Sequence, residues 1–390
     1  MNVSVSQTFN FLPVPTDIHF GCGLLGSLPE RLRALQSRAV FLVTDPGIRA
    51  AGLVDRATAC LERAGIACTV CDRVTPDSGS HLICEGVEAL KASGADVVVG
   101  LGGGSALDTA KAVAALATNA GSPLDYVGLH KVTARPLPTV AIPTTAGTGS
   151  EVSLWSVFTD DTRRVKVAIG GVMLYPTVAL CDPDLTLDLP PAVTAATGMD
   201  ALAHAIECYT NNACQPISAA LALRAIELIG EHLPGAALNG RDPRSRYAMM
   251  LASTMAGVAM NSTRLGLAHA LAMPLGSGAL KIPHGIAVAV TLAPVMDFNF
   301  MAAPERFAAV VRALGVAVDG LSTVEAAARA APAVRRLADI VGIPASLSAC
   351  GMDERHVDEV VDEAMKSGNV VVNPRRTSRE ELAGVLRRAL

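Results

Sequence analysis

The chain has 390 residues, of which 51% are hydrophobic and 17% are charged, and this composition is typical of a compact globular protein with two or three domains. A formal net charge of -4 leaves no excess of basic residues to neutralise phosphates, which excludes a nucleic-acid partner. We expect a soluble protein without a signal peptide or membrane span, because the sequence does not open with a basic stretch and an apolar run, and its longest apolar stretches, such as residues 286–296, are well short of the roughly 20 residues that span a bilayer.

The cysteines indicate a reducing compartment. There are nine, an odd number, scattered from Cys22 to Cys350, which favours reduced thiols in a cytoplasmic protein over a disulfide framework. Cys68 and Cys71 form a C-x-x-C pair inside the strand-like residues 66–71. Because residues three apart in a strand point to opposite faces, we interpret both as strand residues rather than as a redox or metal pair.

The first half of the chain alternates short β-rich runs with helical ones. Strands are predicted at residues 39–45, 66–72, 96–104 and 139–145, helices at 48–64 and 79–93, and further extended segments at 153–159, 165–169 and 177–180. This regular alternation predicts a parallel sheet with crossover helices.

Beyond Pro190 and Pro191 the sequence changes to long segments rich in Ala, Leu and Met, which predict a helix bundle. Helices are predicted at residues 194–209, 217–233, 245–260, 265–272, 304–314, 323–341 with an interruption at Pro332, 353–366, and 379–390 with Thr377 or Ser378 as the N-cap. We therefore predict an α/β domain at residues 1–187 followed by an all-helical domain at residues 188–390.

A glycine-rich turn follows the strand predicted around residues 97–101. It consists of Gly102, Gly103, Gly104 and Ser105 and leads directly into a helix. A strand, a glycine turn and a helix N-terminus form an anion site, because glycines let backbone N–H groups approach and the helix dipole favours negative charge. The pyrophosphate of a dinucleotide fits such a site. Glycines also serve tight turns and close packing, and the spacing differs from G-x-G-x-x-G, so a standard Rossmann fingerprint is not predicted.

Asp45 ends the first predicted strand of the alternation. A carboxylate there accepts hydrogen bonds from an adenosine ribose and repels a 2′-phosphate, which favours NAD over NADP. The alternative interpretation, a turn aspartate in the sequence Asp-Pro-Gly, is equally compatible with the sequence.

Four side chains in the helical half suit one metal ion. Asp200 and His204 are four residues apart in a predicted helix and project from one face. His269 and His284 follow, giving one carboxylate and three imidazoles, a ligand set for Fe(II) or Zn(II). Each histidine alone would be an ordinary core or surface residue, but their occurrence in an otherwise apolar half favours a shared site.

These features resemble the iron-containing, group III alcohol dehydrogenase family. The resemblance extends over nearly the whole chain and rests on GGGSALDTAK (102–111), PTTAGTGSEV (143–152), DPDLTLDLPP (182–191), GMDALAHAIE (198–207), LGLAHALAMPLG (265–276), PHG (283–285) and NPR (373–375). It implies a dinucleotide-binding α/β domain and a metal-binding helical domain, the dehydroquinate synthase-like fold, with the active site in the cleft between them.

The resemblance also implies roles for individual residues. The metal and the reaction would be served by Asp200, His204, His269 and His284. The cofactor would contact Asp45, Gly102, Gly103, Gly104, Ser105, Asp108, Thr144, Thr145, Thr148 and Lys166.

Two positions depart from the family or qualify the resemblance. The family has a second histidine four residues after the one matched by His269, where it serves near the nicotinamide, but this chain has Met273. Trp155 follows the PTTAGTGSEV motif at a place that borders the substrate pocket in relatives, although a role in packing is equally compatible with the sequence.

The resemblance implies hydride transfer between NAD, or NADP, and a small alcohol or aldehyde, with Fe(II) or Zn(II) as a Lewis acid on the substrate oxygen. The partners expected are a small-molecule substrate and further copies of the chain, with neither nucleic acid nor membrane. The alternatives are an enzyme resembling glycerol dehydrogenase or maleylacetate reductase, and a lyase resembling 3-dehydroquinate synthase. The latter has more basic residues in its substrate pocket than this helical half contains.

Overall fold

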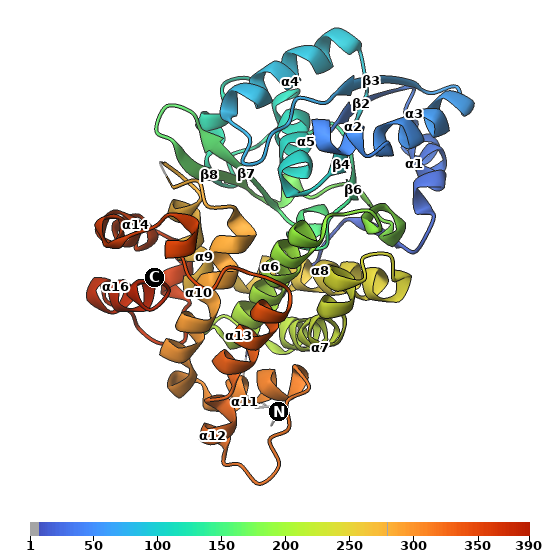
Figure 1. Ribbon diagram of the computed structural model, residues 1–390. Helices are drawn as coiled ribbons and strands as arrows, with labels where there is room; N and C mark the ends of the chain where they lie inside the picture. Colours follow the sequence, from blue (N-terminus) through green and yellow to red (C-terminus); the bar gives the residue numbers. More distant parts are fainter. Residues whose placement is uncertain (1–7, 279) are drawn as a thin grey trace.

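The computed structural model places an α/β half on a helical half, with helices α6 and α9 at the border between them (Figure 1). It describes residues 8–278 and 280–390. Residues 1–7, which belong both to the N-terminal stretch considered above for a signal peptide and to the predicted α/β domain, lie outside the described residues, as does residue 279.

The α/β half is built on a parallel sheet of six strands. Their order across the sheet is β1 (Asp17–Phe20), β9 (Val178–Cys181), β6 (Thr139–Pro143), β4 (Val97–Gly102), β2 (Ala39–Val43) and β3 (Ala67–Cys71). Strands β4, β6 and β9 are buried throughout, because helices cover both faces of the sheet. The predicted parallel sheet is therefore confirmed.

The two faces of the sheet have separate apolar cores. Val40 and Leu42 of β2 pack with helices α1 (Leu28–Ala34) and α3 (Leu53–Arg63) on one face. Phe41 and Val43 pack on the other with helices α4 (Ser80–Ser93) and α5 (Gly104–Leu116). This alternation follows from the two-residue period of a strand.

Strand β3 shows the same alternation. Cys68 contacts the core on the α1 and α3 side, and Cys71 contacts the core on the α4 and α5 side. The prediction that the C-x-x-C residues face opposite ways is confirmed. All nine cysteines lie in the described part and are free thiols.

The helix predicted at residues 48–64 is divided into two. Helix α2 (Pro46–Ala50) ends before Gly52, whose φ of 74° is left-handed, and α3 begins at Leu53. Glycine adopts this conformation at little cost, so it separates the two helices. A small second sheet of β5 (Gly128–Leu129), β8 (Val165–Gly170) and β7 (Trp155–Asp160) lies beside α5.

The helical half begins at Pro191. Its helices are α6 (Pro191–Thr210), α7 (Pro216–Leu238), α8 (Pro243–Thr263), α9 (Leu267–Leu275), α10 (His284–Asn299), α11 (Pro304–Ala313), α12 (Thr323–Ala327), α13 (Ala330–Ile340), α14 (Val357–Ala364), α15 (Gly368–Val371) and α16 (Arg379–Arg387). The predicted interruption near Pro332 is confirmed. It lies at Ala328 and Arg329, because the proline ring clashes with the carbonyl four residues earlier. Ser378, rather than Thr377, is the N-cap of α16.

Helix α10 was not predicted as an element. Its length also differs from the expectation that every apolar segment is too short to span a membrane. In the described part of the chain, the single helix His284–Ala302 is long and apolar enough to cross a bilayer by length and composition. Since 67% of its most apolar window is buried, it is also what a core helix of a globular protein looks like.

A buried arginine holds the connection between the two halves. Arg246 on α8 is 3% exposed, and its guanidinium donates hydrogen bonds to the carbonyls of Leu189 and Gly240 and to the hydroxyl of Thr194, at 3.1, 2.7 and 2.8 Å. The connection before α6 is therefore fixed by a side chain from α8, and with it the start of the helix that carries Asp200.

We expect Arg246→Lys to lower the free energy of unfolding by about 2 kcal/mol, because Nε, Nη1 and Nη2 of the guanidinium each donate to a different acceptor, and the single nitrogen of a lysine does not reproduce this spread, so that a buried carbonyl would lose its donor. Urea denaturation followed by circular dichroism measures this. The matched control is Arg224→Lys, whose parent side chain is 55% exposed and pairs with Glu227 on the same helix. Equal effects of the two substitutions would contradict the role of Arg246.

Candidate active site

The predicted cofactor residues gather at one edge of the large sheet. Asp45 lies two residues after β2, Gly102 ends β4, and Thr144 directly follows β6. These strands are neighbours, and their registers pair Val43 with Gly100 and Gly102 with Pro143. After β2, the chain adds β3 on one side of it and then returns to add β4, β6 and β9 on the other side. The strand order therefore reverses between β2 and β4. Ligands of open parallel sheets bind outside the carboxyl ends of the strands at such a switch point.

The glycine turn and the threonine loop lie against each other. A Cβ atom added to Gly103 would lie 3.5 Å from Thr145, and one added to Gly104 would lie 2.7 Å from Cγ2 of Thr148. The glycines therefore allow close packing of the two loops, which was one of the roles that the sequence allowed for them. The two loops form one cradle at the N-terminus of α5, which suits a pyrophosphate. In this cradle the buried hydroxyl of Thr144 has no hydrogen-bond partner among the described residues.

The two carboxylate oxygens of Asp45 have different neighbours: one caps helix α2, and the other faces the glycine turn. Its Oδ1 accepts a hydrogen bond from the N–H of Ile48 at 3.0 Å and caps α2, as the turn interpretation requires. Its Oδ2 lies toward Gly102, 3.3 Å from the position of an added Cβ. The structure thus brings Asp45 to the predicted cofactor edge.

The carboxylate of Asp108 is already bound by other residues of the protein. Its Oδ1 accepts a hydrogen bond from the hydroxyl of Ser150, its Oδ2 accepts one from the N–H of Val157 at 2.9 Å, and Lys111 lies 3.2 Å from Oδ1. These contacts support a role in holding the loop after β6 rather than direct contact with a cofactor. Ser105 accepts a hydrogen bond from the N–H of Asp77 at 3.2 Å.

Asp200, His204, His269 and His284 converge as predicted. From Oδ1 of Asp200, the Nε2 atoms of His269, His284 and His204 lie at 3.3, 3.8 and 3.9 Å. Helix α10 can bring His284 this close because Gly285 packs on α6, where an added Cβ would lie 2.5 Å from the carbonyl of Ala196.

Two buried atoms face each other at the centre of this cluster. Oδ1 of Asp200 and Nε2 of His269 lie 3.3 Å apart, and neither makes a hydrogen bond with any other group among the described residues. Unpaired buried polar atoms are costly, and an ion between them would remove the cost. One carboxylate oxygen and three imidazole nitrogens suit a divalent transition metal, so the residues present fit the metal that the sequence predicted.

The charges of the cluster depend strongly on one another. Burial alone would raise the pKa of Asp200, but the three imidazoles outweigh it and hold that pKa well below its usual range. Burial likewise opposes protonation of His269, but the carboxylates of Glu207 and Asp200 raise its pKa to about 9. Burial lowers the pKa of His284 to about 3, with a contribution from Lys166. The carboxylate is therefore ionised, ready to bind a cation.

Two groups behind the ligands were not predicted. Glu207, on α6, accepts a hydrogen bond from Nδ1 of His269 at 2.6 Å and further ones from the N–H groups of Gly266 and Ala268. The carbonyl of Gly147 accepts one from Nδ1 of His204 at 3.2 Å. Each bond leaves Nε2 of the ring free to bind a metal. Glu207 lies three residues after His204, and this helical spacing was the signal that could have identified it.

Comparison with known proteins agrees with these features. The family model "Iron-containing alcohol dehydrogenase" matches residues 15–183, and "Fe-containing alcohol dehydrogenase family, C-terminal" matches residues 194–390. The chain belongs to the iron-containing alcohol dehydrogenase family. The resemblance found in the sequence is confirmed.

Relatives and solved structures match over almost the full length of this alcohol dehydrogenase. Choline dehydrogenase of Bacillus subtilis (strain 168) is 39% identical over 378 residues, which are 96% of this chain and 94% of the relative. NAD-dependent methanol dehydrogenase of Bacillus methanolicus is 38% identical over 381 residues, 98% of this chain and 100% of the relative. A solved structure of 1,3-propanediol oxidoreductase is 38% identical, with a TM-score of 0.95, and covers 98% of this chain and 100% of its own. These matches confirm the fold class and the activity of a metal-dependent oxidoreductase that transfers a hydride between a nicotinamide cofactor and an alcohol or aldehyde.

The structure shows what surrounds Met273 and Trp155, the two positions that depart from the family or qualify the resemblance. Met273 is half-buried on α9, one helical turn after His269, and its side chain carries no group that can relay a proton. Trp155 covers Gly170 on the neighbouring strand, where an added Cβ would lie 2.3 Å from its ring. This contact supports a packing role for Trp155.

Metal binding is expected to release about one proton at neutral pH, because His269 keeps a proton up to its raised pKa of about 9 and must lose it to bind the ion. The proton competes with the metal below that pKa, so the apparent affinity for Zn(II) rises with pH from about 6.5 to 9 and then levels off. Calorimetric titration of the metal-free protein in buffers of different ionisation enthalpy measures the proton count. A count near zero at neutral pH would contradict a protonated His269.

Glu207→Gln should lower the affinity for Zn(II) about 10- to 100-fold, because the carboxylate that orients His269 and increases its basicity is lost. Proton release at neutral pH should fall in the same variant. The matched control is Glu231→Gln on α7, whose parent side chain is 74% exposed. Unchanged zinc affinity in Glu207→Gln would remove Glu207 from the metal site.

Proposed function

We propose that this alcohol dehydrogenase interconverts a short alcohol and its aldehyde with NAD(H) in the cleft between its two halves. The observation that carries the proposal is the meeting of Asp200 and His269, buried and unpartnered, with His204 and His284 around them. A family member without a metal, such as one resembling maleylacetate reductase, would leave these atoms unsatisfied.

The roles of the site residues follow from their positions. Asp200, His204, His269 and His284 would hold the metal. The glycine turn, Ser105 and the threonines of the loop after β6 would hold the pyrophosphate and nicotinamide ribose, Asp45 would bind the adenosine ribose, and Lys166 would lie beside the nicotinamide end. Asp108 would act from behind by holding that loop.

Bound there, the metal would act as a Lewis acid on the substrate oxygen and lower the pKa of an alcohol. The nicotinamide ring would exchange the hydride with the substrate carbon. The residues of the chain hold the reacting groups in position. Glu207 and the carbonyl of Gly147 fix the rings of His269 and His204, and the latter contact connects the metal cluster directly to the loop that would hold the cofactor. Met273 leaves proton exchange to water or to another group.

Finer points belong to the same proposal. The carboxylate of Asp45 favours NAD over NADP, and iron is favoured by the family, with Zn(II) as the alternative. The names of the relatives include one substrate with a permanent positive charge, choline, and two uncharged ones, methanol and 1,3-propanediol. We propose a cytoplasmic homo-oligomer whose nucleotide-binding unit is residues 1–187 and whose metal-binding unit is residues 188–390.

The test is anaerobic purification followed by metal analysis and by NADH and NADPH oxidation against a panel of short aldehydes, with Fe(II) or Zn(II) added. We expect metal-dependent oxidation of NADH, and loss of both the metal and turnover in His269→Ala. His232→Ala, on the exposed side of α7, serves as the control. An active, metal-free His269→Ala variant would contradict the assignment, and bound NAD and metal without reduction of any aldehyde would favour the lyase alternative.

A further inference from the structure

An ion pair joins two segments close to α9, the helix that carries His269. Lys166, on β8, has a side chain that is only 5% exposed, and its Nζ lies 2.6 Å from Oδ1 of Asp77. Asp77 precedes α4, and its carboxylate is 40% exposed. Among the described residues Lys166 has this single charged partner, so its charge is balanced by one carboxylate at the edge of solvent.

The ammonium of Lys166 lies between the two parts of the candidate active site. On the helical side it touches Gly276, directly after α9, where an added Cβ would lie 2.8 Å from Nζ. On the nucleotide side, the backbone of Asp77 donates to Ser105 at the start of α5. The positive charge of Lys166 also contributes to the low pKa of His284. A substrate bound at the metal cluster would therefore experience the charge of this pair.

We propose that Asp77 determines the charge of the accepted substrate: by neutralising Lys166, it makes the enzyme selective for uncharged alcohols and aldehydes over those that carry a carboxylate or sulfonate. The inference rests on the proposed function and specifies its substrate class. With a divalent ion bound, the carboxylates of Asp200 and Glu207 balance the metal, and Asp77 balances Lys166. An anionic substrate then gains no net attraction and loses its hydration, which is a cost for any charge taken into a buried site.

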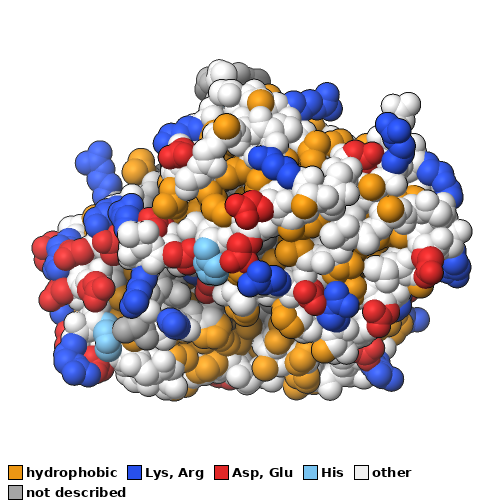
Figure 2. Space-filling view, turned by 90° about the horizontal axis from the view of Figure 1, so that it is seen from above, with side chains coloured by type: hydrophobic (Ala, Val, Ile, Leu, Met, Phe, Trp, Pro, Cys, Tyr) orange, Lys and Arg blue, Asp and Glu red, His pale blue; other side chains and the backbone are white. Residues whose placement is uncertain are grey.

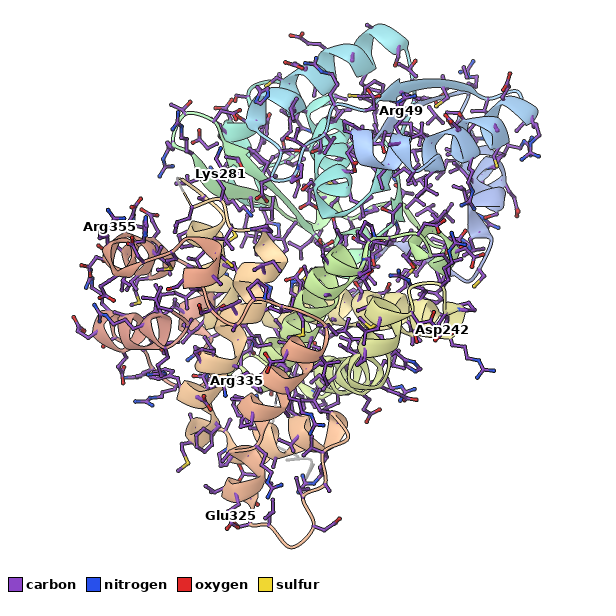
Figure 3. All side chains as sticks on the ribbon, in the orientation of Figure 1. Arg49, Asp242, Lys281, Glu325, Arg335 and Arg355 are labelled. Atoms are coloured by element: carbon purple, nitrogen blue, oxygen red, sulfur yellow. The ribbon has the colours of Figure 1, made fainter. Side chains whose placement is uncertain are left out.

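Two further cations, Arg164 and Lys281, belong to the same region of the chain as Lys166 and Gly276. Arg164 and Lys281 are exposed, and Lys281 lies at the outer end of the border between the two halves (Figure 3). Exposed charges are screened by salt, whereas the ammonium of Lys166 is buried. The charge seen by a substrate therefore depends mainly on whether Lys166 is paired.

The structure indicates a substitution that changes the charge and little else. Asp77 has a φ of 55°, a left-handed conformation that asparagine tolerates as well as aspartate. Asp77→Asn also keeps an oxygen that can accept a hydrogen bond from Lys166. Lys166 would remain in place but carry an unbalanced positive charge.

The test compares two aldehydes of equal chain length, butyraldehyde and succinate semialdehyde, at saturating NADH with the metal added. We expect the wild type to prefer butyraldehyde. In Asp77→Asn, the ratio of kcat/KM for succinate semialdehyde to that for butyraldehyde should rise at least about tenfold, equivalent to about 1.4 kcal/mol. Lys166→Gln leaves Asp77 unpaired, so the same ratio should fall.

The matched control is Asp161→Asn, which removes the same charge from a carboxylate that pairs with His81 instead of Lys166. Its ratio should stay at the wild-type value. A second readout needs no turnover: calorimetric titration of the zinc-loaded protein, without cofactor, with 4-hydroxybutyrate and with 1-butanol. Asp77→Asn should bind 4-hydroxybutyrate at least about tenfold more tightly than the wild type and leave the affinity for 1-butanol unchanged.

The outcomes separate the two proposals. If the wild type reduces butyraldehyde but Asp77→Asn changes neither the ratio nor the affinity for 4-hydroxybutyrate, the charge inference is overturned and the proposed function stands. A wild type that prefers succinate semialdehyde would overturn the inference as well. If metal and NADH bind but neither aldehyde is reduced, the proposed function itself fails.

Discussion

The carboxylate of Asp200 lies inside the protein among three imidazoles, and a buried carboxylate is costly unless a positive charge accompanies it. In the metal-free protein the proton on His269 supplies that charge, held by Glu207 on the other side of the ring. A divalent ion would take the place of that proton, and the rings of His269 and His204 are already oriented by the bonds of their Nδ1 atoms. Much of the helical half serves this arrangement: α6 supplies Asp200, His204 and Glu207, and α9 and α10 each contribute one ligand.

The metal cluster also fixes where the two halves meet. His204 is hydrogen-bonded to the carbonyl of Gly147, in the loop that packs on the glycine turn. This contact joins a residue of the metal cluster to the loop that would hold the cofactor. Arg246 adds a second restraint by holding the connection before α6. On the face shown in Figure 2, basic and acidic side chains are interspersed.

The sequence predicted those parts of the molecule that depend on local pattern. The alternation of strands and helices, the glycine turn, and the i, i+4 spacing of Asp200 and His204 follow from local pattern. His269 and His284 completed a metal-ligand set by residue type, and the family resemblance implied the same four ligands. Helix α10 was missed because most of its sixteen residues are apolar, on every side of the helix, and because it contains Pro294, so no helical periodicity stands out. The contact of Glu207 with His269 and the pair of Asp77 with Lys166 were missed because these partners come from distant segments, and only tertiary packing brings them together. For Glu207 itself, the i, i+3 spacing from His204 was a local signal.

Two lysines are buried in the α/β half, and their surroundings explain why only one can tune the substrate. Lys111 donates to the carbonyls of Ser150 and Trp155 at 2.9 and 2.5 Å and lies beside Asp108, so its charge is satisfied on several sides and it holds the loop after β6 in place. Lys166 has one carboxylate partner, and that carboxylate reaches solvent. A change at Asp77 therefore alters the field at the metal cluster while the fold around it persists. Substrate charge could in this way be adjusted at a position outside the metal ligands, without disturbing the buried balance of Asp200 and Glu207 on which metal binding depends.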